Sequence, residues 1–338
     1  MNKRIENINN LPTKTLPILS DKEVVEKYDK GWSYSNVYFL QPVKDIYLII
    51  RNSDPNKLDI KKIREEYLKT TSDLSHKWSE RKILEYVNGI KNFGLIDQNY
   101  NVISNLFEGS KPGNPIAPKD FDDFRIIFFN YFRFKEIATW YISPTPDVHS
   151  KFESISLDQL TNYSKPIYAM KEGKFFNKVI LQLDNIETVY IIDEKSSHLM
   201  RFYEVFLKWG ITLNLMEKFN LNLVNIKTAD NKDITMSYFI KPFEPFILRE
   251  YVLSLRINKR QISIPELVFQ IAKDFQYSVN EIKEFIVSQI KCNDDLTYER
   301  TSAVFIVKGS NNQEKIKAAT YLYPIINYSY VSHLIIRQ

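Results

Sequence analysis

The chain has 338 residues, of which 44% are hydrophobic and 14% aromatic. This composition predicts a folded protein of two or three domains and excludes a disordered chain. The 46 Lys and Arg residues against 41 Asp and Glu leave a net charge of only +5, so an anionic partner must be met by local basic patches.

Cysteine and histidine usage limits the chemistry further. A single cysteine, Cys292, excludes an internal disulfide and a cysteine-rich zinc site, and it fits a reducing cytoplasm. The four histidines are too scattered to form a close metal-binding pair. No apolar run reaches the length of about 18 residues that a membrane span needs, and the polar N-terminus does not resemble a signal peptide. We therefore expect a cytoplasmic protein with no membrane contact.

Residues 1–57 are predicted to form a β-rich entry segment. Val37–Leu40 and Asp45–Ile50 are rich in β-branched and aromatic residues, and Gln41–Lys44 separates them. This pattern predicts a hairpin. The polar run Asn52–Asn56 is predicted to end its second strand.

Residues 58–110 change to a helical period. Two helices are predicted, and the second ends at Asn92-Phe93-Gly94 with a glycine suited to a helix C-terminus. Leu95–Ile103 follows as a short strand, a polar turn and a returning strand. The apolar faces of the two helices are Ile60, Ile63, Tyr67 and Leu68 in the first, and Ile83, Leu84, Val87 and Ile90 in the second.

The passage Lys91–Asp97 resembles the step from helix to wing in winged-helix domains. The resemblance is to the outline of the superfamily, not to one family. The motif covers about 45 residues. It implies a module that binds nucleic acid or docks a protein.

The middle of the chain, residues 119–243, is predicted to be a mixed α/β region. Lys111–Pro118 holds three prolines and a glycine and is predicted to be a linker at its edge. Phe121–Ile142 is predicted to be one long aromatic helix that lies in a core or at a subunit interface. Arg125, Arg133 and Lys135 on that helix offer an alternative, a surface on which bases stack.

Further elements of the middle region follow from alternation and helical period. The turn Asp184–Glu187 is expected between two of the strands. The predicted elements are the strands Val179–Leu183 and Thr188–Ile192, the helix Met200–Lys218, a hairpin of Leu221–Lys227 with Thr235–Ile240, and the helix Glu244–Leu255.

Residues 244–338 are predicted to hold a second winged-helix-like module. Ser263–Glu266 and Ser278–Glu281 each have the spacing of a capping box, which marks the start of a helix. Leu296–Tyr298 and Ser302–Val307 then read as a hairpin. The small core of this module is predicted to comprise Leu267, Ile271, Ile282, Phe285 and Ile286.

The predicted fold class is therefore α+β, with two winged-helix-like modules flanking a mixed α/β middle region. The predicted function is that of a DNA-binding or scaffold component, most simply without catalysis, with duplex DNA as its partner. Base-reading side chains must be polar and long enough to reach base edges from a helix face. The candidates are Arg81, Glu85, Asn88, Lys91 and Asn92 in the first module, Asn280, Lys283, Glu284, Ser288 and Lys291 in the second, and the basic patch Arg256, Lys259 and Arg260.

An enzymatic alternative depends on four residues of the middle region. Asp184, followed by Asp193, Glu194 and Lys195, resembles the PD-(D/E)xK nucleases. That resemblance implies carboxylates that hold Mg²⁺ and a lysine that orients the attacking water. A five-residue strand between Asp184 and Asp193 would separate them by about 16 Å, so we expect them not to converge.

Other catalytic signatures fail. Cys292 has no neighbouring histidine, and the chain has only eight glycines and no glycine-rich phosphate loop. We therefore expect no cofactor unless the nuclease alternative holds. A third alternative is a protein-binding adaptor, such as a subunit of a restriction or defence assembly, or a homo-oligomer, with Phe121–Ile142 as the contact helix.

Overall fold

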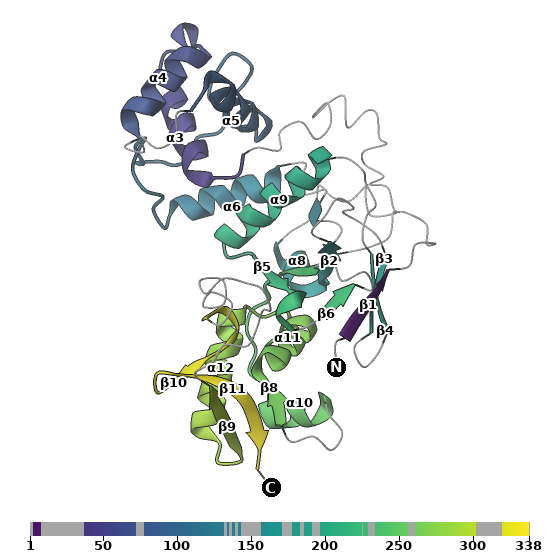
Figure 1. Ribbon diagram of the computed structural model, residues 1–338. Helices are drawn as coiled ribbons and strands as arrows, with labels where there is room; N and C mark the ends of the chain where they lie inside the picture. Colours follow the sequence, from purple (N-terminus) through teal and green to yellow (C-terminus); the bar gives the residue numbers. More distant parts are fainter. Residues whose placement is uncertain are drawn as a thin grey trace. The chain divides into compact units, whose positions relative to one another are not determined.

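The computed structural model is an α+β protein (Figure 1). It describes residues 3–7, 37–71, 78–131, 134, 137–138, 141–142, 157–170, 178–182, 186–190, 197–224, 226–228, 234–255, 261–301 and 320–337. Among these, no helix has the length and apolar character needed to cross a membrane.

The chain divides into two compact units that are both discontinuous in sequence. Unit 1 comprises Met1–Thr13, Thr161–Ile192 and Glu217–Gln338, and unit 2 comprises Lys14–Leu160 and Asp193–Met216. The sequence suggested four consecutive segments instead. That division differs because local composition does not show which distant segments share a core.

Unit 2 begins with helices that pack against one another. Asp59 and Ser79 stand at N-cap positions, where their side chains accept hydrogen bonds from the backbone N–H groups of Lys62 and Lys82. The two helices predicted between residues 58 and 92 are therefore confirmed. The elements are α3 (Leu40–Arg51), the short 3-10 helix η1 (Pro55–Lys57), α4 (Ile60–Thr70) and α5 (Glu80–Asn92), followed by a single antiparallel bridge between Ile96 and Val102.

The prediction of a hairpin in residues 37–50 is wrong, because Leu40–Arg51 forms helix α3. Every residue from Pro42 to Ile50 is buried. A helix that is buried all round presents an almost continuous apolar run, which cannot be told from strands by its period. Pro42 lies in the first turn, where its missing N–H breaks no helical hydrogen bond.

The predicted linker Lys111–Pro118 is a packed loop inside unit 2. The fully buried Lys44 donates hydrogen bonds from Nζ to the carbonyl oxygens of Asn114 at 2.8 Å and Pro115 at 3.0 Å. The buried Asp45 accepts the N–H of Gly113 at 3.0 Å. Gly113 has a φ of +81°, and a Cβ there would collide with the carbonyl oxygen of Thr70. The prolines and the glycine therefore belong to an ordered loop, not to a linker between domains.

An aromatic core joins α6 (Asp120–Asn130) to α9 (Ser197–Thr212) in unit 2. Phe128 stacks on Phe206 with ring centroids 5.0 Å apart, and Phe124 meets Trp209 edge-on at 5.8 Å. The Trp209 ring also donates its N–H to the carbonyl oxygen of Val37 at 2.9 Å. The interpretation of these aromatic residues as core is confirmed for the described positions.

Two predicted helix boundaries in this core are wrong. Helix α6 stops at Asn130 because Tyr131 is extended, with φ −67° and ψ 120°, so Phe121–Ile142 is not one helix. No proline or glycine signals that break. Helix α9 stops at Thr212, and Asn214 turns the chain with a φ of +54°, so the helix does not reach Lys218.

Two sheets of unit 1 join strands from distant parts of the chain. The first has the order β4-β3-β1-β6 and the second the order β2-β7-β5. Helix α8 (Leu157–Tyr163) precedes β2 in the chain, and the 3-10 helix η3 (Leu221–Val224) lies between β5 and β6. The strands are β1 (Lys3–Asn7), β2 (Ile167–Met170), β3 (Lys178–Gln182), β4 (Ile186–Tyr190), β5 (Met216–Asn220), β6 (Ile226–Thr228) and β7 (Ile234–Phe239).

These pairings confirm one prediction and correct another. Strands β3 and β4 pair antiparallel as expected, with boundaries shifted by one or two residues. The hairpin predicted from Leu221 to Ile240 is wrong. Strand β6 pairs in parallel with β1, and β7 pairs with β2, so neither uses its sequence neighbour.

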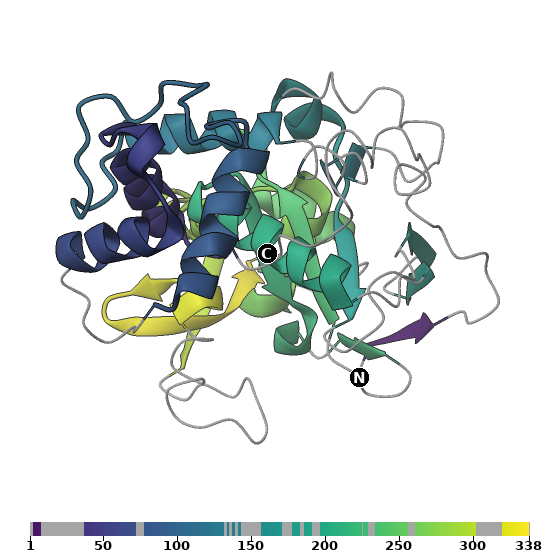
Figure 2. The same cartoon turned by 90° about the horizontal axis from the view of Figure 1, so that it is seen from above.

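In its described residues, the C-terminal part of unit 1 combines helices with an antiparallel sheet. Strand β11 lies between β8 and β9 and also pairs with β10, the hairpin drawn in yellow in Figure 2. Ser302–Val307, the predicted partner of β9, lies outside the described residues. The elements are α10 (Leu248–Leu255), β8 (Gln261–Ser263), α11 (Ile264–Phe275), α12 (Val279–Cys292), β9 (Leu296–Thr301), β10 (Ile325–Ile326) and β11 (Ser329–Ile336).

Local signals placed α11 and α12 well, but only one of the two capping boxes forms. Ser278 accepts the N–H of Glu281, and the Glu281 carboxylate accepts the N–H of Ser278. Ser263 stands at the N-cap of α11 but makes no side-chain cap bond, and Pro265 lies in the first turn of the helix. Helix α10 starts at Leu248, four residues later than predicted. The predicted small core is buried: Leu267, Ile271, Ile282, Phe285 and Ile286.

Removing the Lys44 ammonium tests whether buried charge holds the loop of unit 2. Its partner Asp120, 3.4 Å away, is also buried and accepts hydrogen bonds from Ser110 and Ala117. Lys44→Met leaves this carboxylate without its cation, so we expect it to lower the free energy of unfolding by about 3–5 kcal/mol in urea titration. The double variant Lys44→Met/Asp120→Asn removes both charges and is expected to lose less. An equal loss in both variants would contradict a role for the ion pair.

Candidate nucleic-acid interface

Two helices carry the predicted nucleic-acid contacts, α5 in unit 2 and α12 in unit 1. Both helices bury an apolar stripe against their own unit. The opposite faces carry five of the polar residues that the sequence singled out, in exposed positions: Arg81, Asn280, Glu284, Ser288 and Lys291. Amphipathic packing therefore fixes which side chains can meet a partner.

On α5, Arg81 is the most exposed of the predicted residues. Its side chain is 89% exposed and lies 3.9 Å from Glu85, which also pairs with Lys82 at 3.2 Å. Asn88 is half-buried on the same helix. Ion pairs this exposed contribute little to stability, so Arg81 can exchange its partner at small cost.

Lys91 and Asn92 at the end of α5 are used by the protein itself. Lys91 donates to the carbonyl oxygen of Gln98 at 3.2 Å and lies 4.6 Å from the ring centroid of Tyr100. Burial lowers the pKa of Lys91. The amide nitrogen of Asn92 is buried and makes no hydrogen bond. Lys91 therefore contacts the turn after α5, and neither Lys91 nor the amide nitrogen of Asn92 is exposed in the way that the sequence predicted.

On α12, four of the predicted residues share one exposed face. They recur every three or four positions, which places them on the same side of a helix. Lys283 differs from them: it is half-buried, its pKa is lowered by burial, and it donates to the carbonyl oxygen of Thr320 at 2.9 Å. The exposed residues are Asn280, Glu284, Ser288 and Lys291.

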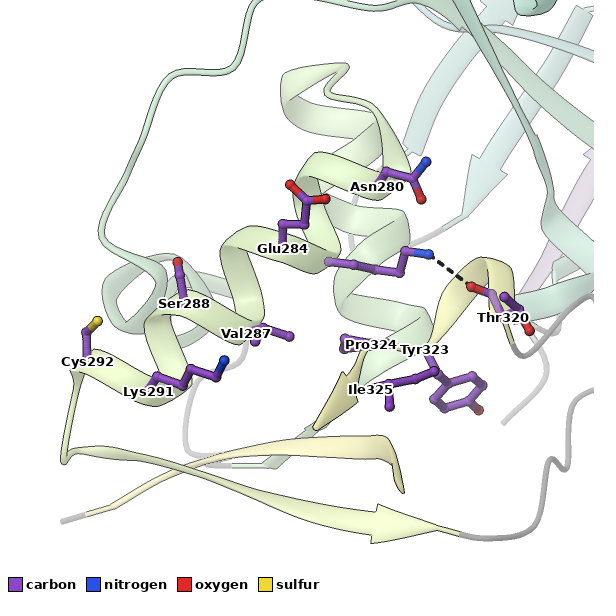
Figure 3. A pocket seen from close by; sticks show the side chains of 11 residues that line it. Asn280, Glu284, Val287, Ser288, Lys291, Cys292, Thr320, Tyr323, Pro324 and Ile325 are labelled. Atoms are coloured by element: carbon purple, nitrogen blue, oxygen red, sulfur yellow. Dashed lines mark hydrogen bonds between the residues drawn. The ribbon is translucent and has the colours of Figure 1, made fainter. Parts of the chain in front are cut away.

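This face is one wall of a groove of about 620 Å³, and Thr320–Ile325 forms the other wall (Figure 3). Figure 3 shows Tyr323, Pro324 and Ile325 across the groove from α12. This second wall was not predicted from the sequence. Its one sequence signal is the aromatic run Tyr321–Tyr323 before a proline, which taken alone is also typical of ordinary core.

Glu217, at the start of strand β5, links the two walls and was not predicted either. Its carboxylate accepts the N–H of Val279 in the first turn of α12 at 3.1 Å, and the hydroxyl of Tyr321 at 3.0 Å. Burial raises the pKa of Glu217, although both hydrogen bonds act in the opposite direction. A negative charge at a helix N-terminus also interacts favourably with the helix dipole. One carboxyl group thus positions α12 relative to Thr320–Ile325.

Several predicted residues lie outside the described part of the chain. These include the basic patch Arg256, Lys259 and Arg260, and the nuclease candidates Asp184, Asp193, Glu194 and Lys195. The described strand between the nuclease candidates is β4, Ile186–Tyr190. In the described ranges, no group of three or more His, Cys, Asp or Glu side chains is arranged to hold a metal ion. The Mg²⁺ alternative therefore stays a prediction.

Comparison with protein-family models, curated proteins and solved structures found no match for this chain. No residue role is therefore transferred from a relative. The function must be inferred from the geometry of α5, α12 and the groove.

Substituting Glu217 tests how the groove is held together. Glu217→Ala leaves the Val279 N–H without its acceptor and the Tyr321 hydroxyl with only the carbonyl oxygen of Lys218, at 3.3 Å. We therefore expect the free energy of unfolding to fall by about 1–3 kcal/mol. Glu217→Gln keeps a carbonyl acceptor and removes the cost of burying a charge. It is expected to be about as stable as the wild type at neutral pH, or more stable.

The pH dependence of the same pair gives a second readout. A raised pKa in the folded state means that the folded protein binds this proton more tightly than the unfolded chain does. Wild-type stability relative to Glu217→Gln should therefore fall as the pH rises from the ordinary glutamate pKa of 4.5 through the raised value. Urea unfolding at several pH values measures this difference, and parallel curves for the two proteins would contradict it.

Proposed function

We propose that this chain binds nucleic acid through helix α5 and helix α12, that α5 contacts duplex DNA, and that the chain acts as a DNA-binding or scaffold component. The observation that carries the proposal is the order of elements at the end of unit 1. Helices α11 and α12 are joined by only three residues, and strands β9 and β11 pair next to them. This order resembles a helix-turn-helix with a wing, in which the second helix is the reading helix.

Helix α12 has the properties that such a reading helix needs. Its apolar side is buried through Ile282, Phe285 and Ile286, and the capping box at Ser278 fixes its start. Its polar residues lie on the exposed side. A helix held in this way can present the same side chains to a partner without paying further ordering entropy.

Helix α5 supports the same proposal in unit 2. It is the last of the helices α3, α4 and α5 that pack together, and a compact turn follows it. Asp97 fixes that turn by accepting the N–H groups of Asn99 and Asn101, both at 2.8 Å. Arg81 suits a phosphate or a guanine edge, and Asn88 suits adenine.

Salt and one substitution test the duplex proposal. Contacts to phosphates release counterions, so we expect the affinity for duplex DNA to fall about tenfold or more between about 50 and 200 mM salt. Arg81→Ala should weaken binding and reduce the slope of log affinity against log salt by about one. Fluorescence anisotropy with a labelled duplex measures both effects.

Lys57→Ala is the matched control, because Lys57 is also a strongly exposed cation of unit 2 but lies on η1, outside α5. Its salt slope is expected to stay at the wild-type value. If no duplex binds at low salt, the duplex contact of α5 is overturned. If no nucleic acid of any form binds, the protein-binding adaptor becomes the better explanation. If both variants change the slope equally, binding is diffuse and α5 is not the contact surface.

A further inference from the structure

We propose that the groove between α12 and Thr320–Ile325 binds an unpaired nucleic-acid strand, with a base stacked on Tyr323 and a phosphate near Lys291. The proposal deepens the proposed function, because it names the form of nucleic acid that α12 takes. It requires that α12 contacts nucleic acid, but it does not require that α5 binds a duplex.

The two walls of the groove differ in the way that a nucleotide strand requires. The α12 wall carries Lys291 among mostly polar side chains, whereas Tyr323, Pro324 and Ile325 line the opposite wall (Figure 3). Proteins bind unpaired strands with this combination, a cationic track for the phosphates and an aromatic ring for the bases. A volume of about 620 Å³ lies within the range of small-molecule sites, so one or two nucleotides fit.

Tyr323 is positioned as a stacking platform. Its ring meets Tyr330 of β11 edge-on, with centroids 6.2 Å apart and planes 66° from each other. Tyr323 is only half-buried, and Ile325 beside it is 55% exposed. Covering exposed apolar surface of this kind with a base removes it from water, which favours binding.

The polar groups of the groove are not satisfied by one another. Asn280, Glu284 and Lys291 make no side-chain hydrogen bond or ion pair within the described part of the chain, whereas Lys283 is already bonded to Thr320. Lys291 offers a cation to a phosphate, and Asn280 offers both a donor and an acceptor. Glu284 offers only acceptors, which match the exocyclic amine of a base.

The groove favours an unpaired strand over a duplex. A duplex presents only base edges in its grooves, while its base faces are covered by stacking. Tyr323 can therefore be used only by a base that has left the stack. Glu284 adds a preference among bases, since cytosine carries an exocyclic amine and thymine does not.

Binding of short labelled oligo-dC and oligo-dT to the full chain, measured by fluorescence anisotropy at low salt, tests the proposal. We expect oligo-dC to bind about tenfold more tightly than oligo-dT, the effect of one hydrogen bond to a charged acceptor. Glu284→Gln should narrow this ratio, because a side-chain amide both donates and accepts. A change in base preference would not follow from a purely structural role of Glu284.

Substitutions at Tyr323 and Lys291 test the two walls of the groove. Tyr323→Ala should weaken oligo-dC binding about tenfold, whereas Tyr323→Phe keeps the ring and should bind like the wild type. Lys291→Ala should weaken binding and lower its salt dependence. Lys165→Ala, which removes an exposed lysine of unit 1 outside the groove, is the matched control and should change nothing.

The outcomes separate this inference from the proposed function. If the duplex binds but neither oligonucleotide does, the inference fails while the duplex proposal stands. If the oligonucleotides bind and the duplex does not, the inference about the groove stands and the duplex contact of α5 fails. If oligo-dC binds equally to the wild type, Tyr323→Ala and Lys291→Ala, the strand binds elsewhere on the protein. The groove is then overturned as the nucleic-acid site and is left open to a protein ligand.

Discussion

The Glu217 carboxyl group is the interaction on which the candidate interface of unit 1 depends. It accepts the N–H of Val279 and the hydroxyl of Tyr321, so it joins the first turn of α12 to the segment that faces it. Burying a carboxyl group is costly unless hydrogen bonds compensate, and here both compensating bonds come from elements that line the groove or lead into it. Loss of either bond would remove one of the interactions that compensate the partial burial of this carboxyl group. Glu217 therefore ties together the elements on the two sides of the groove, and such preorganisation favours binding.

Unit 2 uses buried charge in a similar way. Lys44 and Asp45, neighbours on α3, bond to three consecutive residues, Gly113, Asn114 and Pro115, of the loop that leads into α6. A loop of this composition contributes few apolar contacts, so hydrogen bonds to its backbone carbonyl and N–H groups fix its path over the surface. Charged side chains on a rigid helix provide those hydrogen bonds. In both units, irregular chain is fixed by ionisable groups on regular elements, while the apolar cores determine where those elements lie.

The two candidate surfaces differ in their chemistry. On α5, Arg81 projects into solvent from an open helix face. On α12, the exposed face is opposite an aromatic wall, and one of its lysines is already bonded to Thr320. An open cationic face suits a phosphate backbone or a base edge, whereas a walled groove suits a ligand that inserts. With a net charge of only +5, neither surface can depend on the field of the whole protein, so specific contacts must provide the binding energy.

The sequence by itself determined the elements whose signals are local. Helices α4, α5, α11 and α12 follow from apolar spacing, and the capping box at Ser278 joins residues only three positions apart. Tertiary structure decided the rest. The apolar run of α3 fits a helix or two strands equally well until its neighbours bury it on every side. Strand β9 pairs with β11, and Glu217 meets Tyr321, across stretches of chain that no local pattern spans. Such contacts depend on which distant segments share a core, and that choice is made by packing.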